Sequence, residues 1–244
     1  MPPSVSQLAF DSLPTVIQQT LPHVRRVVLI ANNPSITQAY LSRFLRPDDM
    51  LVLFNHFIHA DFFSQHPAAC HLPKLLFFRK IGDAPLHFGL PPRANNLPQI
   101  AKMAATAPLG ILFGNAVYAY PSMRDDPSPD DDPVTETRVL MVDTALQARF
   151  NDREHSRSLS EHHPVVADYP YFHDIHSSAA SSGFLLYRLL LAVREYERDA
   201  PLALALLGFH HDANTPHFWQ GHNWQFEREE MRRAPDGVSV VVCG

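Results

Sequence analysis

Short, continuous apolar runs alternate with helical stretches along this chain, and this alternation most constrains its fold. Most of the runs do not alternate apolar and polar residues, which is typical of strands covered on both faces. Strands that alternate with helices predict βα units and a mainly parallel sheet. The predicted strands span Val27–Ile30, Met50–Phe54, Lys74–Phe78, Leu109–Phe113, Val139–Val142, Leu202–Leu207 and Val238–Val242. The predicted helices span Ser35–Leu45, Asn96–Thr106, Ser182–Arg198 and Trp224–Arg233.

The 244 residues fit one large domain. We therefore predict a single α/β domain over residues 1–244, Rossmann-like, with a mostly parallel sheet and helices on both of its faces. A stretch from Tyr120 to about Ser178 interrupts the pattern, because it is rich in Pro, Asp, His and Ser. A loop of this length is unusual unless it is a lid or an insertion. We expect an irregular acidic, Pro-rich insertion at about 120–178, with Val139–Phe150 as the part that could be regular.

Charge and cysteine usage narrow the function classes. Lys and Arg total 20 against 25 Asp and Glu, which disfavours a nucleic-acid binder. The two cysteines are too few for a disulfide framework and match no metal spacing, which favours a reducing compartment. The first residues do not resemble a secretory signal, and the most apolar segment, Phe184–Val193, is too short for a membrane span. The sequence thus predicts a cytoplasmic protein that touches the inner membrane at most peripherally.

Polar residues follow the predicted strands where ligands bind in open α/β sheets, beyond the carboxyl ends. Asn32 and Asn33 follow the first strand and Asn55 follows the second. Asn both donates and accepts hydrogen bonds, which suits ribose, base edges and sugar hydroxyls, although it is also common in turns. The segment from Asn33 to Ser35 predicts a turn whose helix presents free N–H groups to a phosphate.

Two later segments add candidate ligand groups. Ser181, Ser182 and Gly183 begin a long apolar helix, where they act as a cap or bind an anion. The histidine of Gly221-His222 precedes the last predicted helix and is a candidate general base, because the ordinary pKa of histidine lies near working pH. Further candidates follow the sixth strand: His210, His211, Asp212 and Trp219.

Taken in order, these motifs resemble those of the bacterial sialyltransferases that decorate lipooligosaccharide, and of related CMP-sugar transferases. The chain has Asn-Asn-Pro-Ser after the first strand where that family has Gly-Asn-Gly-Pro-Ser. It has an Asn after the second strand, Ser-Ser-Gly where the family has Thr-Ser-Gly, and Trp-Gln-Gly-His where the family has Tyr-x-Gly-His. The resemblance spans most of the chain, and it is carried by a few ordered positions.

The resemblance implies an inverting transferase that uses a CMP-activated keto-acid sugar and no metal ion. It implies that Asn32 and Asn55 bind the nucleotide of the donor, and that Ser181 to Gly183 hold its phosphate or the sugar carboxylate. It also implies that Trp219 replaces the phosphate-binding Tyr and that His222 is the general base. The acceptor would be an oligosaccharide or glycolipid of the bacterial surface. Trp219, Asn33 and the acidic stretch depart from the family, so sialic acid and 3-deoxy-manno-octulosonate (Kdo) both stay open as donor sugars.

Three alternatives remain at this point. The first is a metal-dependent hydrolase that uses a His and Asp cluster, although its spacing matches no named zinc motif. The second is a metal site of the Asp-x-Asp kind at Asp130–Asp132, which a solvated acidic loop explains better. The third is a non-catalytic nucleotide-binding relative, because a fold alone does not prove activity. The hydrolase would draw its ligands from His173, Asp174, His176, His210, His211, Asp212, His217 and His222.

Overall fold

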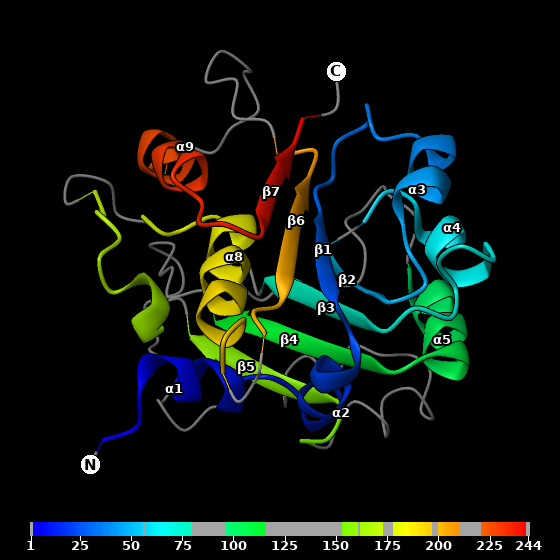
Figure 1. The fold of residues 1–244 in the computed structure, drawn as a ribbon, viewed down its shortest axis with the longest axis horizontal. Helices are drawn as coiled ribbons and strands as arrows, with labels where there is room; N and C mark the ends of the chain where they lie inside the picture. The colour runs from blue at the N-terminus through cyan, green and yellow to red at the C-terminus, as the bar shows by residue number, and fades with distance from the viewer. Residues whose placement is uncertain are drawn as a thin grey trace, which may run out of the picture.

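In the computed structural model of this chain, the described residues contain seven parallel strands that form one sheet (Figure 1). The structure describes residues 2–55, 57–79, 96–115, 153–160, 162–172, 178–196, 200–209 and 221–242. Strands lie in the order β5-β4-β3-β2-β1-β6-β7, and every neighbouring pair is parallel. They are β1 (Arg26–Ile30), β2 (Asp49–Phe54), β3 (Lys74–Arg79), β4 (Leu109–Asn115), β5 (Ser156–Ser160), β6 (Ala203–Leu207) and β7 (Val238–Val241).

The continuous apolar runs form strands because the sheet has a hydrophobic core on each face. Along β1, Val27 and Leu29 enter one core while Val28 and Ile30 enter the other. Side chains alternate between the two faces of a strand, so a strand with two covered faces needs apolar residues at every position. This arrangement confirms the predicted α/β, Rossmann-like class.

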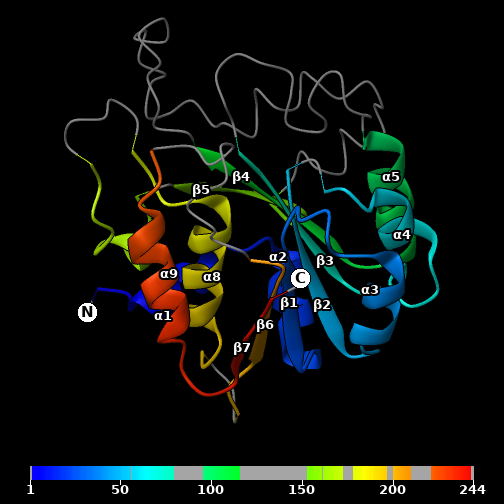
Figure 2. The ribbon, with the colours of Figure 1, turned by 90° about the horizontal axis from the view of Figure 1, so that it is seen from above.

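Helices cover both faces of the sheet, as Figure 2 shows from above. Helices α3 (Gln38–Phe44), α4 (Ala60–Gln65) and α5 (Leu97–Thr106) lie on one face. The other face carries α1 (Val5–Asp11), α2 (Thr15–Thr20), the 3-10 helix η2 (Pro164–Val166), α8 (Ser182–Val193) and α9 (Trp224–Arg232). A short 3-10 helix, η1 (Leu21–His23), leads into β1.

Helix α8 is apolar around most of its circumference because it is covered on several sides. Phe184, Leu185, Leu186, Tyr187, Leu189, Leu190 and Val193 are all buried. One side of α8 faces the sheet, and α1, η2 and α9 cover other sides (Figures 1 and 2). Its first turn is therefore held firmly at the edge where the strands end.

The structure corrects several predicted boundaries. Helix α3 begins at Gln38 rather than Ser35, because Oδ1 of Asn33 accepts a hydrogen bond of 2.9 Å from the N–H of Ser35 and Thr37 caps the helix instead. Ser35 is an exposed turn residue, so the predicted turn from Asn33 to Ser35 is present and the predicted helix start at Ser35 is wrong. Helix α8 ends at Val193 and not at Arg198.

The sequence analysis did not predict several helices and one strand, because the hydrophobic patterns of these elements are weak. Strand β5 and helix η2 lie within the stretch predicted to be irregular, so Ser156–Ser160 and Pro164–Val166 are regular elements there. Strand β5 has polar residues at most positions, since it is the last strand described on its side of the sheet. Helices α1, α2 and α4 are too short to give a clear helical period. The predicted strand Val139–Val142 and the rest of 116–152 lie outside the described residues.

Candidate functional site

The order of the sheet reverses at β1, which lies between β2 and β6. From β1, the strands β2 to β5 follow one another toward one edge of the sheet. Strand β6 lies on the other side of β1. Open α/β sheets bind ligands at the carboxyl ends of the strands beside such a switch point. The segments that follow Ile30 and Leu207 are therefore the first place to seek a site.

Two asparagines after β1 tie the ends of three strands together. Nδ2 of Asn33 donates a hydrogen bond of 3.1 Å to the carbonyl oxygen of Gly208, directly across the switch point. Nδ2 of Asn32 donates one of 2.8 Å to the carbonyl oxygen of Phe54, at the end of β2. Both amide ends of Asn33 are thus used within the protein. Asn32 has no hydrogen bond to its Oδ1 among the described residues, so that atom can meet a ligand.

Asn55, immediately after β2, has an unusual backbone. Its φ is 50°, the one positive φ of a residue other than glycine in the described parts of the chain. Its N–H donates a hydrogen bond of 2.7 Å to the carbonyl oxygen of Phe77, which holds this conformation. Such backbone strain is enriched at functional sites, and Asn tolerates it better than most residues. Asn55 is half-buried beside the switch point.

The first turn of α8 begins at the same edge of the sheet. Oγ of Ser181 caps the helix by accepting a hydrogen bond of 3.1 Å from the N–H of Phe184. The same hydroxyl donates one of 2.6 Å to Oε2 of Glu227, and the Ser181 N–H donates one of 2.8 Å to Oε1. Ser181 therefore has no proton left for a ligand. The N–H groups of Ser182 and Gly183 donate no hydrogen bond within the described residues.

Aromatic packing joins this helix start to the strand ends. A Cβ at Gly183 would lie 2.3 Å from Cε1 of Phe209, so glycine is required for the ring to approach. The ring of Phe209 in turn meets that of Phe54 edge-on, with 6.1 Å between the centroids. Phe54 is the residue whose carbonyl accepts from Asn32. One run of contacts thus links the candidate residues of α8, β2 and β1.

His222 is fixed beside the start of α8 by backbone contacts. Its Nδ1 lies 2.7 Å from the carbonyl oxygen of Ala179, and the N–H of Ala179 donates to the carbonyl of Gly221 at 3.0 Å. A carbonyl oxygen only accepts, so Nδ1 carries the proton and Nε2 of the neutral ring carries the lone pair. This is the tautomer that a general base needs for Nε2 to act. The Trp224 ring packs edge-on at 4.9 Å.

Glu227 and Tyr169 were not among the predicted site residues. Glu227 is 0% exposed although it lies in the first turn of α9, where sequence reasoning treats an acid as an exposed partner of the helix dipole. Oη of Tyr169 donates to its Oε1 at 3.0 Å. No local signal marks this burial, because it depends on α9 lying beside α8. A carboxylate here also reduces the positive potential that α8 offers to a second anion.

Several predicted residues lie outside the described parts of the chain. These are His210, His211, Asp212 and Trp219, and also His173, Asp174, His176 and His217 from the hydrolase alternative. Within the described residues, no three His, Cys, Asp or Glu side chains gather closely enough to hold a metal ion.

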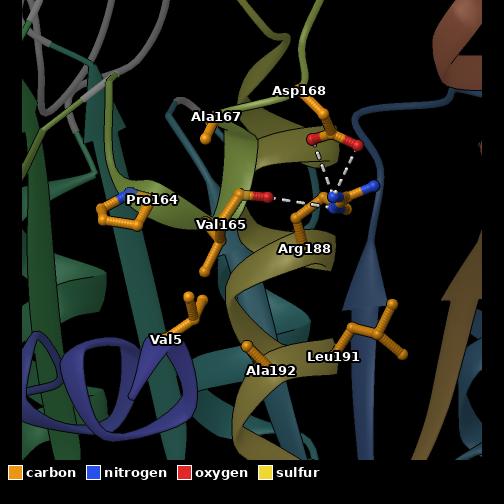
Figure 3. A pocket seen from close by; sticks show the side chains of 8 residues that line it. All are labelled: Val5, Pro164, Val165, Ala167, Asp168, Arg188, Leu191 and Ala192. Atoms are coloured by element: carbon orange, nitrogen blue, oxygen red, sulfur yellow. Dashed lines mark hydrogen bonds and ion pairs between the residues drawn. The ribbon is translucent and has the colours of Figure 1, made fainter. Parts of the chain in front are cut away.

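A surface hollow of about 520 Å³ lies elsewhere, between α1, η2 and α8 (Figure 3). Its lining is mainly aliphatic, with Val5, Leu191 and Ala192 among the contributors. The guanidinium of Arg188 is already bound, to both carboxylate oxygens of Asp168 at 2.8 and 3.0 Å and to the carbonyl of Val165 at 3.0 Å. The hollow contains none of the predicted site residues.

Comparison with known proteins finds no matching family model, no matching curated protein and no matching solved structure. The class is therefore defined by the fold and its switch point alone: a Rossmann-like α/β protein whose candidate residues lie where the strands end. No helix in the described ranges has the length and apolar character to cross a membrane.

Proposed function

We propose that this protein is a glycosyltransferase that moves a keto-acid sugar from a CMP-activated donor to a glycan acceptor, with His222 as the general base. The observation that carries the proposal is the 2.7 Å distance between Nδ1 of His222 and the carbonyl oxygen of Ala179. With Nδ1–H directed at the Ala179 carbonyl, Nε2 is the basic atom of a ring held at the carboxyl edge of the sheet.

The reaction balances with the groups of this chain. The acceptor hydroxyl oxygen bonds to the anomeric carbon of the sugar as the bond from that carbon to the CMP phosphate oxygen breaks. Nε2 of His222 takes the hydroxyl proton, and CMP leaves as an anion, with inversion at the anomeric carbon. A neutral histidine within hydrogen-bond reach of the hydroxyl supplies this proton transfer at neutral pH. The reaction as proposed needs no metal ion.

The donor would lie over the ends of β1 and β2. The side chains of Asn32 and Asn55 supply polar groups for the nucleotide, at strand ends where α/β proteins bind such ligands. The N–H groups of Ser182 and Gly183 would meet the donor phosphate or the sugar carboxylate, since the first N–H groups of a helix have no partner within the helix. Trp219 is proposed to hold the leaving phosphate as the resemblance implies.

The donor sugar is sialic acid or Kdo, because both are keto-acid sugars that are activated as CMP esters and carry a carboxylate. The acceptor is proposed to be an oligosaccharide or glycolipid, which places the enzyme in lipopolysaccharide biosynthesis, at the cytoplasmic side of the inner membrane. These assignments rest on the resemblance and on the site chemistry together.

The first test is a thermal-shift screen without divalent metal. CMP and CTP should raise the melting temperature more than UMP, GMP or ADP, because a ligand that binds only the native state stabilises it by about 2.7 kcal/mol at 100 times its Kd. The second test offers CMP-sialic acid and CMP-Kdo with glycan acceptors and measures transfer. Preference for UMP that depends on manganese would overturn the proposal, and CMP binding without transfer would favour a non-catalytic relative.

A further inference from the structure

We infer that Glu227 and Tyr169 are positioning residues that hold His222 in the Nδ1–H tautomer. The inference rests on the proposed function for its catalytic meaning, but its structural content can be tested without a substrate. It concerns the two segments that carry the ring and its carbonyl partner, which are far apart in sequence.

The first segment, 178–181, carries the carbonyl that His222 faces. Ala179 provides this carbonyl, and Ser181, two residues later, binds Glu227 through its N–H at 2.8 Å and its hydroxyl at 2.6 Å. Two bonds to one carboxylate fix both the position and the direction of this short segment. These bonds therefore fix the position of the Ala179 carbonyl relative to the Glu227 carboxylate.

The second segment, 221–223, carries the ring. The N–H of Asn223 donates a hydrogen bond of 2.6 Å to Oη of Tyr169, whose own proton goes to Oε1 of Glu227 at 3.0 Å. Oδ1 of Asn223 caps α9 by accepting from the N–H of Phe226 at 3.2 Å. His222 is thus bounded on its C-terminal side by a residue that Tyr169 and α9 hold in place.

Both segments are therefore held by the buried carboxylate of Glu227, the first directly and the second through Tyr169. Tyr169 Oη, Ser181 N–H and Ser181 Oγ–H all donate to Glu227, which matches an ionised carboxylate that only accepts. Burying a charge is costly unless such donors surround it, so this arrangement resists displacement of any one of them. The network sets the separation of Ala179 from His222, and with it the tautomer of the ring.

The direct test is ¹⁵N NMR of the histidine side chains, with the His222 signals assigned by loss in His222→Gln. Free imidazole in water favours the Nε2–H tautomer, whereas neutral His222 should show a protonated Nδ1 and an unprotonated Nε2. Tyr169→Phe removes the acceptor of the Asn223 N–H, so the His222 nitrogen shifts should move toward those of a free histidine. Glu227→Gln removes the charge with little change in size, and it should move the shifts in the same direction.

Tyr171→Phe is the matched control. Tyr171 packs against Tyr169 with 5.0 Å between the centroids, and its Oη lies 3.3 Å from Nδ1 of His162. It has no bond to Glu227 in the described network, so its loss should leave the His222 tautomer unchanged. With a CMP-sugar donor, Tyr169→Phe should lower kcat by roughly 10- to 100-fold, the cost of a misplaced catalytic group, while KM for the donor stays the same.

The outcomes separate the two proposals. A wild-type His222 in the Nε2–H tautomer, or equal shifts in Tyr169→Phe and Tyr171→Phe, would overturn the positioning role whatever the protein catalyses. A protonated Nδ1 that is lost in Tyr169→Phe supports that role even if no CMP-sugar is transferred. Absence of CMP-sugar transfer would then contradict the proposed transferase activity and leave the positioning role supported.

Discussion

The side chain of Asn33 donates a hydrogen bond of 3.1 Å to the carbonyl oxygen of Gly208, and it thereby joins the ends of β1 and β6. Gly208 presents this carbonyl because its φ is +74°, in the left-handed region that suits glycine. The bond crosses the switch point of the sheet, where the proposed donor site begins. Its two residues come from segments 175 positions apart in the sequence.

Gly208→Ala should destabilise the protein by more than the 1–2 kcal/mol or so that the left-handed conformation alone costs a non-glycine residue. The added Cβ would lie 2.5 Å from Cδ1 of buried Ile36. Gly237→Ala is the comparison, because Gly237 has φ +80° but its Cβ would meet the guanidinium of Arg194, at 2.9 Å, rather than an aliphatic side chain of the core. Urea denaturation of the two variants checks this, and equal losses would show that Ile36 gives way without cost.

Asn55→Gly should reduce CMP affinity and should destabilise the protein less than Asn55→Ala does. Glycine keeps the backbone at φ 50° without strain and removes only the amide side chain. Asn55→Ala should lose affinity and also about 1 kcal/mol of stability, since alanine is strained there. Calorimetric titration and urea denaturation separate the two effects. Unchanged affinity in both variants would assign Asn55 to the turn alone.

Lys74 should make stability increase with pH in mildly alkaline solution. Its ammonium is 0% exposed and donates to the carbonyls of Ala69, Cys70 and Leu72, and burial lowers its pKa from 10.5 to about 8. Between pH 8 and 10.5 the unfolded chain holds the proton that the folded chain has lost, so stability rises with pH.

The measurement for Lys74 is the free energy of unfolding of the wild type minus that of Lys74→Met, from pH 7.5 to 10.5. This difference should grow with pH, while the same difference for exposed Lys102→Met should stay flat. Subtracting the variant removes the contribution that the two proteins have in common. A flat difference at Lys74 would mean that the three carbonyls keep the pKa of the ammonium at its ordinary value.

His163 should make the protein less stable in mild acid. Burial lowers the pKa of its imidazole below the ordinary 6.5, while Nδ1 accepts from the N–H of Val165 at 3.2 Å and Nε2 lies 3.2 Å from Oγ of Ser12. As the pH falls through 6.5 the unfolded chain gains a proton before the folded chain does. The stability that neutral His163 contributes is present above pH 6.5 and is lost below it.

Urea denaturation from pH 7.5 to 5 tests this prediction for His163. His163→Gln should flatten the loss of stability toward acid, and His162→Gln, at the exposed neighbouring position, should leave it unchanged. An unchanged acid slope in His163→Gln would assign the effect to other groups.

His222→Ala should lower turnover by roughly 10²–10⁴-fold, the usual loss for a general base. CMP binding should change little, because the base acts on the acceptor hydroxyl and not on the nucleotide. Single-turnover transfer at several pH values measures the rate, with His210→Ala and His211→Ala in parallel. If His222→Ala keeps the wild-type rate while His210→Ala or His211→Ala lowers it, the general base is the histidine whose replacement lowers the rate.

The sequence by itself determined the class of fold. Runs such as Val27–Ile30 and Met50–Phe54 are apolar at every position, which only strands with two covered faces require, and the helices between them dictate parallel pairing. The turn chemistry of Asn33 and the capping role of Ser181 could also be predicted, since each depends on neighbours within three residues. Strand β5 could not, because a polar strand has no hydrophobic period to reveal it.

Only the tertiary structure decided what surrounds His222. The sequence predicted the histidine and the serines of α8 as separate candidates, and nothing in it singled out Glu227. The packing of α9 beside α8 buries Glu227 against Tyr169, 58 positions away, and places the Ala179 carbonyl, 43 positions away, on Nδ1 of His222. Such contacts have no signature in a local pattern, because they arise from how whole elements pack rather than from the residues beside them.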